Sequence, residues 1–542
     1  MNTRTHYLLH HLIETRAAQT PAQPALSHRQ EQICYGELST RVQQLASGLG
    51  ELGLQRYERV AIYLPKQHET VISLFAATRA GGVFVPINPV LKPPQVQHIL
   101  SDCNARILIT SHARLQQLAP NLAHLRDLKQ VVLIDDNLSC EHAPYSRVSW
   151  HQLQGAPICS ASPGSVTDTD MAAILYTSGS TGKPKGVVLS HRNLIVGAQS
   201  VAGYLDNTPQ DRILVVLPLS FDAGLSQVTT AFESGACCYL MDYLLPNDVR
   251  RQVARHRITG ITAVPPLWNQ IASLEWSQDA ASSVRYFANT GGHMPQSLLT
   301  RLRRLFPNAQ PFLMYGLTEA FRSTYLPPEQ IDFKPGSIGK AIPNAEVLVL
   351  REDGVPCQPH EPGELVHRGP LVSQGYWNDP EKTRERFRPL PGQAEGLVFK
   401  ELAVWSGDTV TRDEEGYLYF VGRRDEMIKT SGYRVSPDEI EEMAYQSGLI
   451  REAAAVGVPH ATLGQAVLLI VTVPATTDST ESCLDALLQR CREQLPNFMV
   501  PHKCILEAEL PRNPNGKIDR RLLAQRYADL FDDLSEPPHA DG

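Results

Sequence analysis

The sequence predicts an α/β protein with a large N-terminal domain of parallel-rich αβ sheets, a small antiparallel β subdomain, and a small α+β C-terminal domain. Three patterns support this prediction. Helical segments alternate with short apolar strands in the first half, runs of alternating polarity follow around 335–425, and a compact helix and strand unit comes last. We place the domains at residues 1–424 and 425–525, and expect residues 526–542 to be a disordered tail.

The N-terminal segment MNTRTHYLLHHLIETRAAQTP predicts an amphipathic helix, because His10, His11 and Glu14 interrupt its apolar patch, which a secretory signal would not show. Apolar residues at helical spacing predict further helices at 35–54 and 68–82. Short, nearly continuous apolar runs predict buried strands at 59–65, 105–110, 130–136, 212–220, 258–266 and 284–292. This alternation is typical of a largely parallel sheet that helices cover.

The antiparallel region is predicted from alternating runs at 345–350, 363–369 and 416–423, separated by Gly, Pro and Asp turns. After it, Ser436 and Pro437 begin a helix at 436–448. Strands at 452–458 and 466–473 and a helix at 483–495 complete the C-terminal domain, and the closing DDLSEPPHADG is acidic and rich in proline.

Composition limits the possible functions of the chain. At 542 residues it is too long for one core, and its 42% hydrophobic and 20% charged residues are ordinary for a soluble globular protein. A net charge of −7 argues against sequence-independent nucleic-acid binding. No apolar run is long enough to cross a bilayer, so we expect a cytoplasmic protein. The ten cysteines include no C-x-x-C pair, and we expect reduced packing residues, not a zinc site.

The loop YTSGSTGKPKGV, residues 176–187, combines glycines, hydroxyl groups and two lysines. Backbone N–H groups freed by glycine, hydroxyl donors and lysine charge together suit a polyphosphate. A mobile, soluble Gly/Ser loop is the alternative. The Walker pattern does not fit, because Pro184 follows Lys183 and the glycines are too close together, and G-x-G-x-x-G is absent.

Four more motifs follow in order: YGLTEA at 315–320, WSGD at 405–408, GRRDEMIKTSGYRVSPDEIE at 422–441 and NPNGKIDR at 513–520. With the loop, they resemble the adenylate-forming superfamily, which includes acyl-CoA synthetases, adenylation domains of peptide synthetases and firefly luciferase. The resemblance covers residues 7 to 523. It implies that a carboxylate attacks the α-phosphate of ATP to give an acyl-adenylate and pyrophosphate, after which a thiol takes the acyl group and AMP leaves. It also implies that the C-terminal domain is mobile.

The resemblance assigns the ATP-binding residues. Tyr315 would stack on adenine, beside the backbone of Gly291 and Gly292, while Asp408 and Arg423 would bind the ribose. Ser406 replaces the family's usual threonine. The phosphate loop maps onto residues 177–186, and Lys185 is its characteristic lysine. Its expected ATP-binding residues are Thr177, Ser178, Gly179, Ser180, Thr181 and Gly182.

Catalytic roles follow in the same way. Thr318 would donate to the α-phosphate and Glu319 would bind Mg²⁺. Lys517 resembles the lysine that bridges carboxylate and α-phosphate during adenylation, and must be withdrawn before the thiol enters. Asp425 falls at the family's hinge, and Gly432 lies where the thiol tunnel is expected.

The motifs disagree about the acid. Phe221 and Asp222 stand where peptide-synthetase domains place an aspartate that pairs with the substrate ammonium, whereas Pro437 is typical of acyl-CoA ligases. Asp222 would meet a cationic substrate group, meet an internal Arg, Lys or donor, or stay solvated in a local turn. The expected pocket wall also includes residues of modest polarity: Ala223, Ser226, Gly291, Met314 and Phe321.

The predicted function is AMP-forming ligation of a carboxylic acid to a thiol, with ATP and Mg²⁺ and either CoA or the phosphopantetheine of a carrier protein as acceptor. The alternative is a freestanding amino-acid adenylation enzyme that loads a carrier protein, since no carrier domain follows Lys517. The pattern also resembles ligases associated with exosortase and exopolysaccharide loci. An oxygenase like luciferase and a catalytically inactive binding module are further alternatives. The motif residues argue against an inactive module, and no sequence feature suggests oxygen chemistry.

Overall fold

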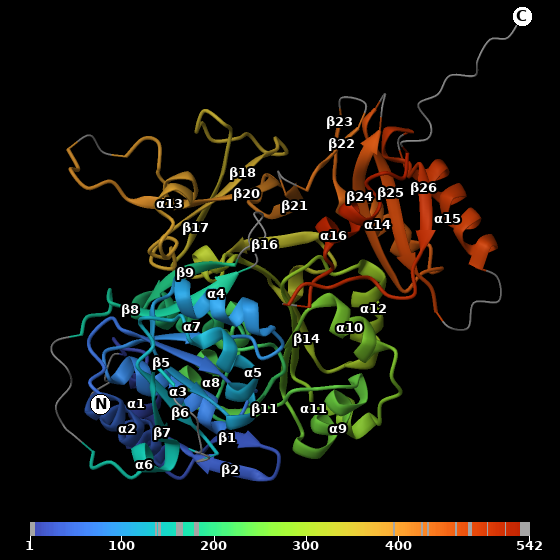
Figure 1. Cartoon of the computed structure of the whole chain (residues 1–542). Helices are drawn as coiled ribbons and strands as arrows, with labels where there is room; N and C mark the ends of the chain where they lie inside the picture. The colour runs from blue at the N-terminus through green and yellow to red at the C-terminus, as the bar shows by residue number, and fades with distance from the viewer. Residues whose placement is uncertain are drawn as a thin grey trace, which may run out of the picture.

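The computed structural model describes residues 6–135, 138, 143–158, 166–177, 184–393, 396–423, 426–430, 433–460, 463–474, 480–495, 497–514 and 516–531. It confirms the predicted fold class. Two sheets and their helices form the large N-terminal body, and a smaller domain coloured orange to red lies against its upper right side (Figure 1). No helix in these residues is long and apolar enough to cross a membrane.

The larger sheet is mixed. Its parallel half contains β1 (Pro24–His28), β10 (Arg212–Val215), β11 (Cys237–Leu240), β12 (Gly260–Ala263), β13 (Tyr286–Asn289) and β14 (Gln310–Tyr315), with β2 (Glu31–Cys34) antiparallel at the edge. Its antiparallel half contains β15 (Thr324–Leu326), β16 (Ser337–Ala341), β17 (Glu346–Leu350), β18 (Gly363–Arg368), β19 (Phe387–Pro389), β20 (Leu402–Arg412) and β21 (Leu418–Arg423). The predicted antiparallel subdomain is therefore continuous with the parallel sheet, through the pairing of β14 with β15 and of β15 with β16.

The second sheet has the order β7 (Ser146–Ser149), β6 (Gln130–Leu133), β5 (Ala105–Thr110), β3 (Arg59–Tyr63), β4 (Val83–Pro86), β8 (Met171–Thr177) and β9 (Lys185–Ser190). All its described pairs are parallel except β8 with β9. In that hairpin Thr177 is directly opposite Lys185, so the glycine-rich loop connects the two strands at the hairpin tip.

Buried helices link the sheets into one core. The largest core cluster includes residues of both sheets and of α1 (His11–Gln19), α2 (Tyr35–Glu51), α3 (His68–Arg79), α7 (His191–Tyr204) and α8 (Asp222–Ser234). α8 is buried on nearly every side, which explains its mostly apolar and small residues. α6 (Trp150–Gln154) contributes Trp150 and Leu153 to the same cluster, and α13 (Pro380–Arg386) has no buried residue. The remaining helices of this domain pack in two further core clusters: α4 (Pro93–Asp102), α5 (His112–Leu122), α9 (Pro246–His256), α10 (Pro265–Ala272), α11 (Gln278–Ser283) and α12 (Gln296–Leu305).

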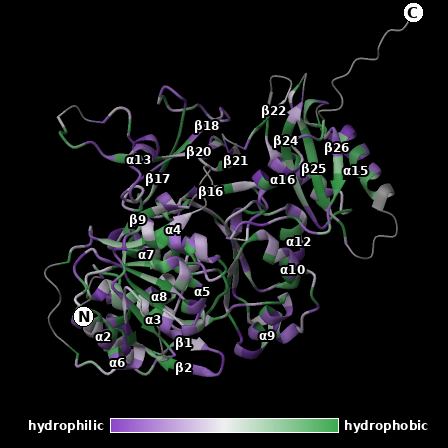
Figure 2. Cartoon of the chain, viewed as in Figure 1, coloured by the Kyte–Doolittle hydropathy of each residue, from purple (hydrophilic) through white to green (hydrophobic). Residues whose placement is uncertain are grey.

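The C-terminal domain has its own core. Its sheet contains β22 (Ile428–Thr430), β23 (Tyr433–Val435), β24 (Glu452–His460), β25 (Gly464–Thr472) and β26 (Lys503–Leu506), and its helices are α14 (Pro437–Gln446), α15 (Thr480–Gln494) and α16 (Arg520–Arg526). Figure 2 shows apolar residues along β24, β25 and β26. Phe531 is buried in this domain, and Tyr527 and Leu530 pack beside it. This corrects the tail predicted from residue 526, because the chain is packed as far as 531.

Candidate active site

The C-terminal domain closes over the N-terminal domain through polar contacts. Asn88 Nδ2 donates to the carbonyl of Pro514 at 2.9 Å, which ties the loop carrying Lys517 to the N-terminal domain. Asn269 Nδ2 donates to the carbonyl of Arg451 at 2.7 Å. Asn88 follows β4 of the second sheet and Asn269 lies on α10, so these contacts join the C-terminal domain to two separate parts of the N-terminal domain.

Lys517 enters this cleft from the C-terminal domain. Its Nζ lies 5.7 Å from the centroid of the Phe221 ring. A Cβ built on Gly291, whose φ is +76°, would lie 3.1 Å from Lys517 Cε, so glycine permits this close approach. Burial lowers the pKa of Lys517 below its usual range, and the carboxylate of Asp222 opposes that shift. The structure thus brings Lys517, Phe221, Asp222 and Gly291 together, and their roles in the reaction stay a prediction.

The expected nucleoside residues also meet. Tyr315, at the end of β14, donates its hydroxyl to the Asp408 carboxylate. Arg423 Nε lies 3.2 Å from Asp408 Oδ1, because Asp408 and Arg423 are directly opposite on β20 and β21. Burial and the neighbouring Asp408 charge raise the pKa of Tyr315, which therefore stays protonated and can hold that carboxylate.

A second cluster surrounds Glu319. Thr318 and Glu319 lie in the 3₁₀ helix η1 (Thr318–Ala320), and Glu319 Oε1 accepts a 2.5 Å hydrogen bond from the hydroxyl of Tyr376. Lys185 Nζ lies 5.7 Å from the centroid of the Tyr376 ring. Burial acts to lower the pKa of Arg386, but the charge of Glu319 outweighs burial and raises this pKa. Tyr376 and Arg386 could not be predicted from the sequence, because neither residue lies in a recognised motif.

Part of the predicted site cannot be placed. Ser178, Gly179, Ser180, Thr181, Gly182, Asp425 and Gly432 lie outside the described residues. The described ends of the phosphate loop, Thr177 and Lys185, are paired across the hairpin, and Lys185 is directed to the Glu319 cluster through Tyr376. Gly292 accepts a hydrogen bond from Asn289 through its carbonyl, next to Gly291.

The structure decides among the alternatives for Asp222. Its carboxylate is 3% exposed, and its Oδ2 lies 3.5 Å from Arg322 Nη1, whose own residue is 2% exposed. Burial raises the pKa of Asp222, and the Arg322 charge opposes this. Asp222 therefore has an internal cation, which the sequence analysis named as one possibility without identifying Arg322.

A narrow cavity lies beside this pair, lined by Val201, Leu205, Ile213, Ala223, Ser226, Gln227, Thr230, Thr262, Tyr286, Met314 and Arg322. Three expected wall residues, Ala223, Ser226 and Met314, are among them. Gly291 and Phe321 are not. The φ of Phe321 is +56°, and its ring packs against α7, where a Cβ on Gly197 would meet it.

Comparison with known proteins agrees with this geometry. Residues 13–377 match the family described as AMP-binding enzyme, and residues 439–517 match the AMP-binding enzyme C-terminal domain. The chain is 31% identical to the long-chain-fatty-acid–CoA ligase of Salmonella typhimurium over 552 aligned residues, covering 94% of this chain and 93% of the relative. It is 30% identical to tyrocidine synthase 2 of Brevibacillus parabrevis, covering 96% of this chain and 14% of that protein. The crystal structure of ATP-bound MatB from Rhodopseudomonas palustris superimposes with a TM-score of 0.84 at 25% identity, covering 96% of this chain and 99% of MatB.

The two-domain fold and the clustered motif residues define an adenylate-forming enzyme. The chain belongs to the AMP-binding enzyme family. Its reaction is AMP-forming ligation of a carboxylic acid to a thiol. The amino-acid adenylation alternative fits less well, and the structure agrees, because Arg322 already neutralises Asp222. The association with exosortase loci stays a prediction.

Proposed function

We propose that this ligase catalyses adenylation in the domain arrangement described above, with Lys517 as the cation that brings the two anionic reactants together. The observation that carries the proposal is the position of Lys517. It comes from the C-terminal domain, yet it lies against Gly291 and Phe221 of the N-terminal domain. A positive charge between a carboxylate and the α-phosphate lowers their repulsion and stabilises charge in the transition state.

ATP would lie across the two polar clusters. Adenine would stack on Tyr315 beside Gly291 and Gly292, and the ribose hydroxyls would donate to Asp408, which Tyr315 and Arg423 orient. The β- and γ-phosphates would bind residues 177–186 and Lys185, and Thr318 would donate to the α-phosphate. The fit of the donor set supports this placement, since nucleoside, phosphate and carboxylate contacts follow one another along the cleft.

Mg²⁺ would bind at Glu319. A carboxylate is the hard oxygen ligand that this ion prefers, and Glu319 is held in place by the hydroxyl of Tyr376. When bound, the ion would neutralise charge on the phosphates. The nearby Arg386 and Lys185 supply further positive charge to the same region.

The second half-reaction needs a different domain arrangement. A thiol can reach the acyl carbon only after Lys517 withdraws, so we propose that the C-terminal domain turns about Asp425 and that Gly432 then lines the thiol tunnel. The thiol would belong to CoA or to the phosphopantetheine of a separate carrier protein.

ATP–pyrophosphate exchange across a panel of carboxylic acids tests the first half-reaction. Lys517→Ala is expected to reduce exchange about 100-fold or more, since it removes a charge that acts on the transition state. Thioester formation from a supplied acyl-adenylate should change by only about twofold. Lys503→Ala, an exposed lysine of the same domain, is the matched control. Equal loss of both half-reactions in Lys517→Ala would contradict this division, and no exchange with any acid would contradict the ligase proposal.

A further inference from the structure

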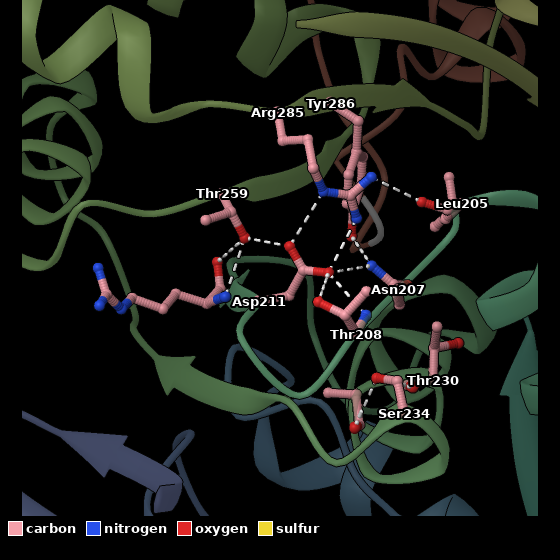
Figure 3. Close-up of polar contacts among 11 residues, drawn as sticks. Leu205, Asn207, Thr208, Asp211, Thr230, Ser234, Thr259, Arg285 and Tyr286 are labelled. Carbon is pink, nitrogen blue, oxygen red and sulfur yellow. Dashed lines mark hydrogen bonds and ion pairs between the residues drawn. The ribbon is translucent and has the colours of Figure 1, made fainter.

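The cavity beside Asp222 and Arg322 is small. It has room of about 10 Å³, close to what one water molecule requires. Tyr286 forms part of its wall, and Asn207 Nδ2 donates to the Tyr286 hydroxyl at 3.4 Å. Asn207 also contacts the Asp211 carboxylate, so Tyr286 is connected to the hydrogen-bond network around Asp211 (Figure 3). Arg285 Nη2 and Thr259 Oγ1 donate to the two oxygens of Asp211, at 2.9 and 2.7 Å.

Three buried polar atoms in and beside this cavity have no hydrogen-bond partner among the described residues: Asp222 Oδ1, Arg322 Nε and Thr230 Oγ1. Asp222, Arg322 and Thr230 are each at most 3% exposed. A buried polar group without a partner is unfavourable, so a bound group that completes these contacts gains affinity. The carboxylate and the guanidinium also neutralise each other, so the pair offers one acceptor and one donor with no net charge.

We propose that the acid this enzyme activates is short and that its acyl chain carries a neutral hydroxyl or carboxamide group, which binds between Asp222 and Arg322. This inference rests on the proposed ligase function and names its substrate class. A hydroxyl or carboxamide is both donor and acceptor, so it can donate to Asp222 Oδ1 and accept from Arg322 Nε. Thr230, on α8, faces the same cavity and can provide a third contact.

The same features disfavour other acids. A long hydrocarbon chain would not fit a space of about 10 Å³ and would leave the polar atoms unpaired. An ammonium group would add a positive charge beside a carboxylate that Arg322 already neutralises, with Lys517 also nearby. A second carboxylate would face Asp222 at close range, which is repulsive.

The test is ATP–pyrophosphate exchange on the full chain with matched short acids. We expect kcat/KM for hydroxybutanoate isomers or succinamate to exceed that for butanoate by about tenfold or more, because a site that hydrogen-bonds a substrate group rejects the analogue that lacks it. The same acids should exceed aminobutanoate, succinate and decanoate. Highest activity with any of these three or with butanoate would overturn the inference while leaving the ligase function intact. No exchange with any acid would overturn both.

Variants of residues at the cavity test where the hydroxyl or carboxamide group binds. Thr230→Val, which removes only the hydroxyl, should lower the preference for hydroxybutanoate over butanoate by about fivefold. Ser234→Ala is the matched control, because Ser234 lies one turn further along α8 and its hydroxyl already donates to the carbonyls of Thr230 and Ala231 (Figure 3). Arg322→Met should lower the same preference without changing the Kd of ATP by more than about twofold. If Arg322→Met fails to fold, the Thr230→Val result still decides. An unchanged preference in Thr230→Val would overturn the proposed binding position.

Discussion

The contact between His293 and Glu442 is predicted to make adenylation depend on pH. His293 Nε2 lies 2.8 Å from Glu442 Oε2, and so joins the N-terminal domain to α14 of the C-terminal domain. Burial alone would lower the pKa of His293, but the hydrogen bond to Glu442 and the charges of Asp438 and Glu441 raise it above its usual 6.5. Burial acts to raise the pKa of Glu442, but the hydrogen bond from His293 outweighs burial, and the pKa of Glu442 lies below its usual 4.5.

These directions fix the sign of the effect. Below pH 6.5 His293 is protonated whether or not the domains are docked, so its interaction with Glu442 contributes fully to domain docking. As the pH rises through the raised pKa of His293, the proton and the interaction are lost. Glu442 remains ionised in the docked arrangement until the pH falls through its lowered pKa. The arrangement that carries out adenylation is therefore favoured from mildly acidic to near-neutral pH.

The free energy that the His293–Glu442 pair contributes to domain docking is limited by the partial exposure of both side chains. Exposed ion pairs contribute up to about 1 kcal/mol and hydrogen bonds to charged groups about 1.5–3 kcal/mol. The two side chains are 32% and 20% exposed, so we expect about 1 kcal/mol, a factor of about five in the docking equilibrium.

Glu442→Gln tests this reasoning in pyrophosphate exchange from pH 5.5 to pH 8.5. The variant should lose about fivefold of the exchange rate at pH 6 and show a flatter decline toward alkaline pH. Thioester formation from a supplied acyl-adenylate should be nearly unchanged. Glu509→Gln, an exposed glutamate of the same domain, serves as the control. The reasoning fails if Glu442→Gln retains the wild-type pH profile, or if both half-reactions fall equally.

Three further predictions concern the N-terminal domain. Tyr376→Phe removes the hydrogen bond to Glu319, and should weaken the apparent Mg²⁺ affinity in exchange assays by about threefold to tenfold, whereas an unchanged Mg²⁺ titration would show that Tyr376 does not orient Glu319. Gly197→Ala forces the buried ring of Phe321 to move, and should lower the free energy of unfolding by about 1–3 kcal/mol in urea titrations; a change within error would mean that the ring has room to shift. Burial lowers the pKa of His367 to about 4 in the folded protein. Between about pH 6.5 and pH 4 the unfolded state therefore binds more protons than the folded state. The free energy of unfolding should fall as the pH drops through this range. His367→Gln should reduce that dependence, and an identical slope in the variant would contradict the assignment.

The sequence predicted much of the fold because buried strands produce continuous apolar runs. The runs at 105–110 and 284–292 correspond to β5 (Ala105–Thr110) and β13 (Tyr286–Asn289). Residues 526–531 were assigned to the tail because the acidic, proline-containing end dominated the composition. Tyr527, Leu530 and Phe531 are spaced as one face of a helix, and this spacing could have indicated their packing.

The candidate site could be predicted only where a residue lies within a short motif. Asp408 lies in such a motif, and its contact with Tyr315 brings two motifs together, while its role at the ribose stays a prediction. Arg322 was not identified, because its partner Asp222 lies 100 positions earlier and no local pattern connects them. The packing of the Phe321 ring against Gly197 could not be predicted for a related reason, because a positive φ in a non-glycine residue has no signature in sequence.

Charge pairing within the cleft gives a physical reason for the proposal that the C-terminal domain supplies a cation. Asp408 is paired with Arg423 and Asp222 with Arg322, while Arg386 lies close to Glu319. Arginines that already neutralise carboxylates have less charge to offer to ATP and a second anionic reactant. We propose that Lys185 and Lys517, which come from different domains, supply it. The position of Lys517 depends on contacts such as Asn88 with Pro514, so removing those contacts should weaken adenylation without altering any residue that touches substrate. The proposed control of the reaction by domain position would therefore be a consequence of how the N-terminal cleft pairs its own charges.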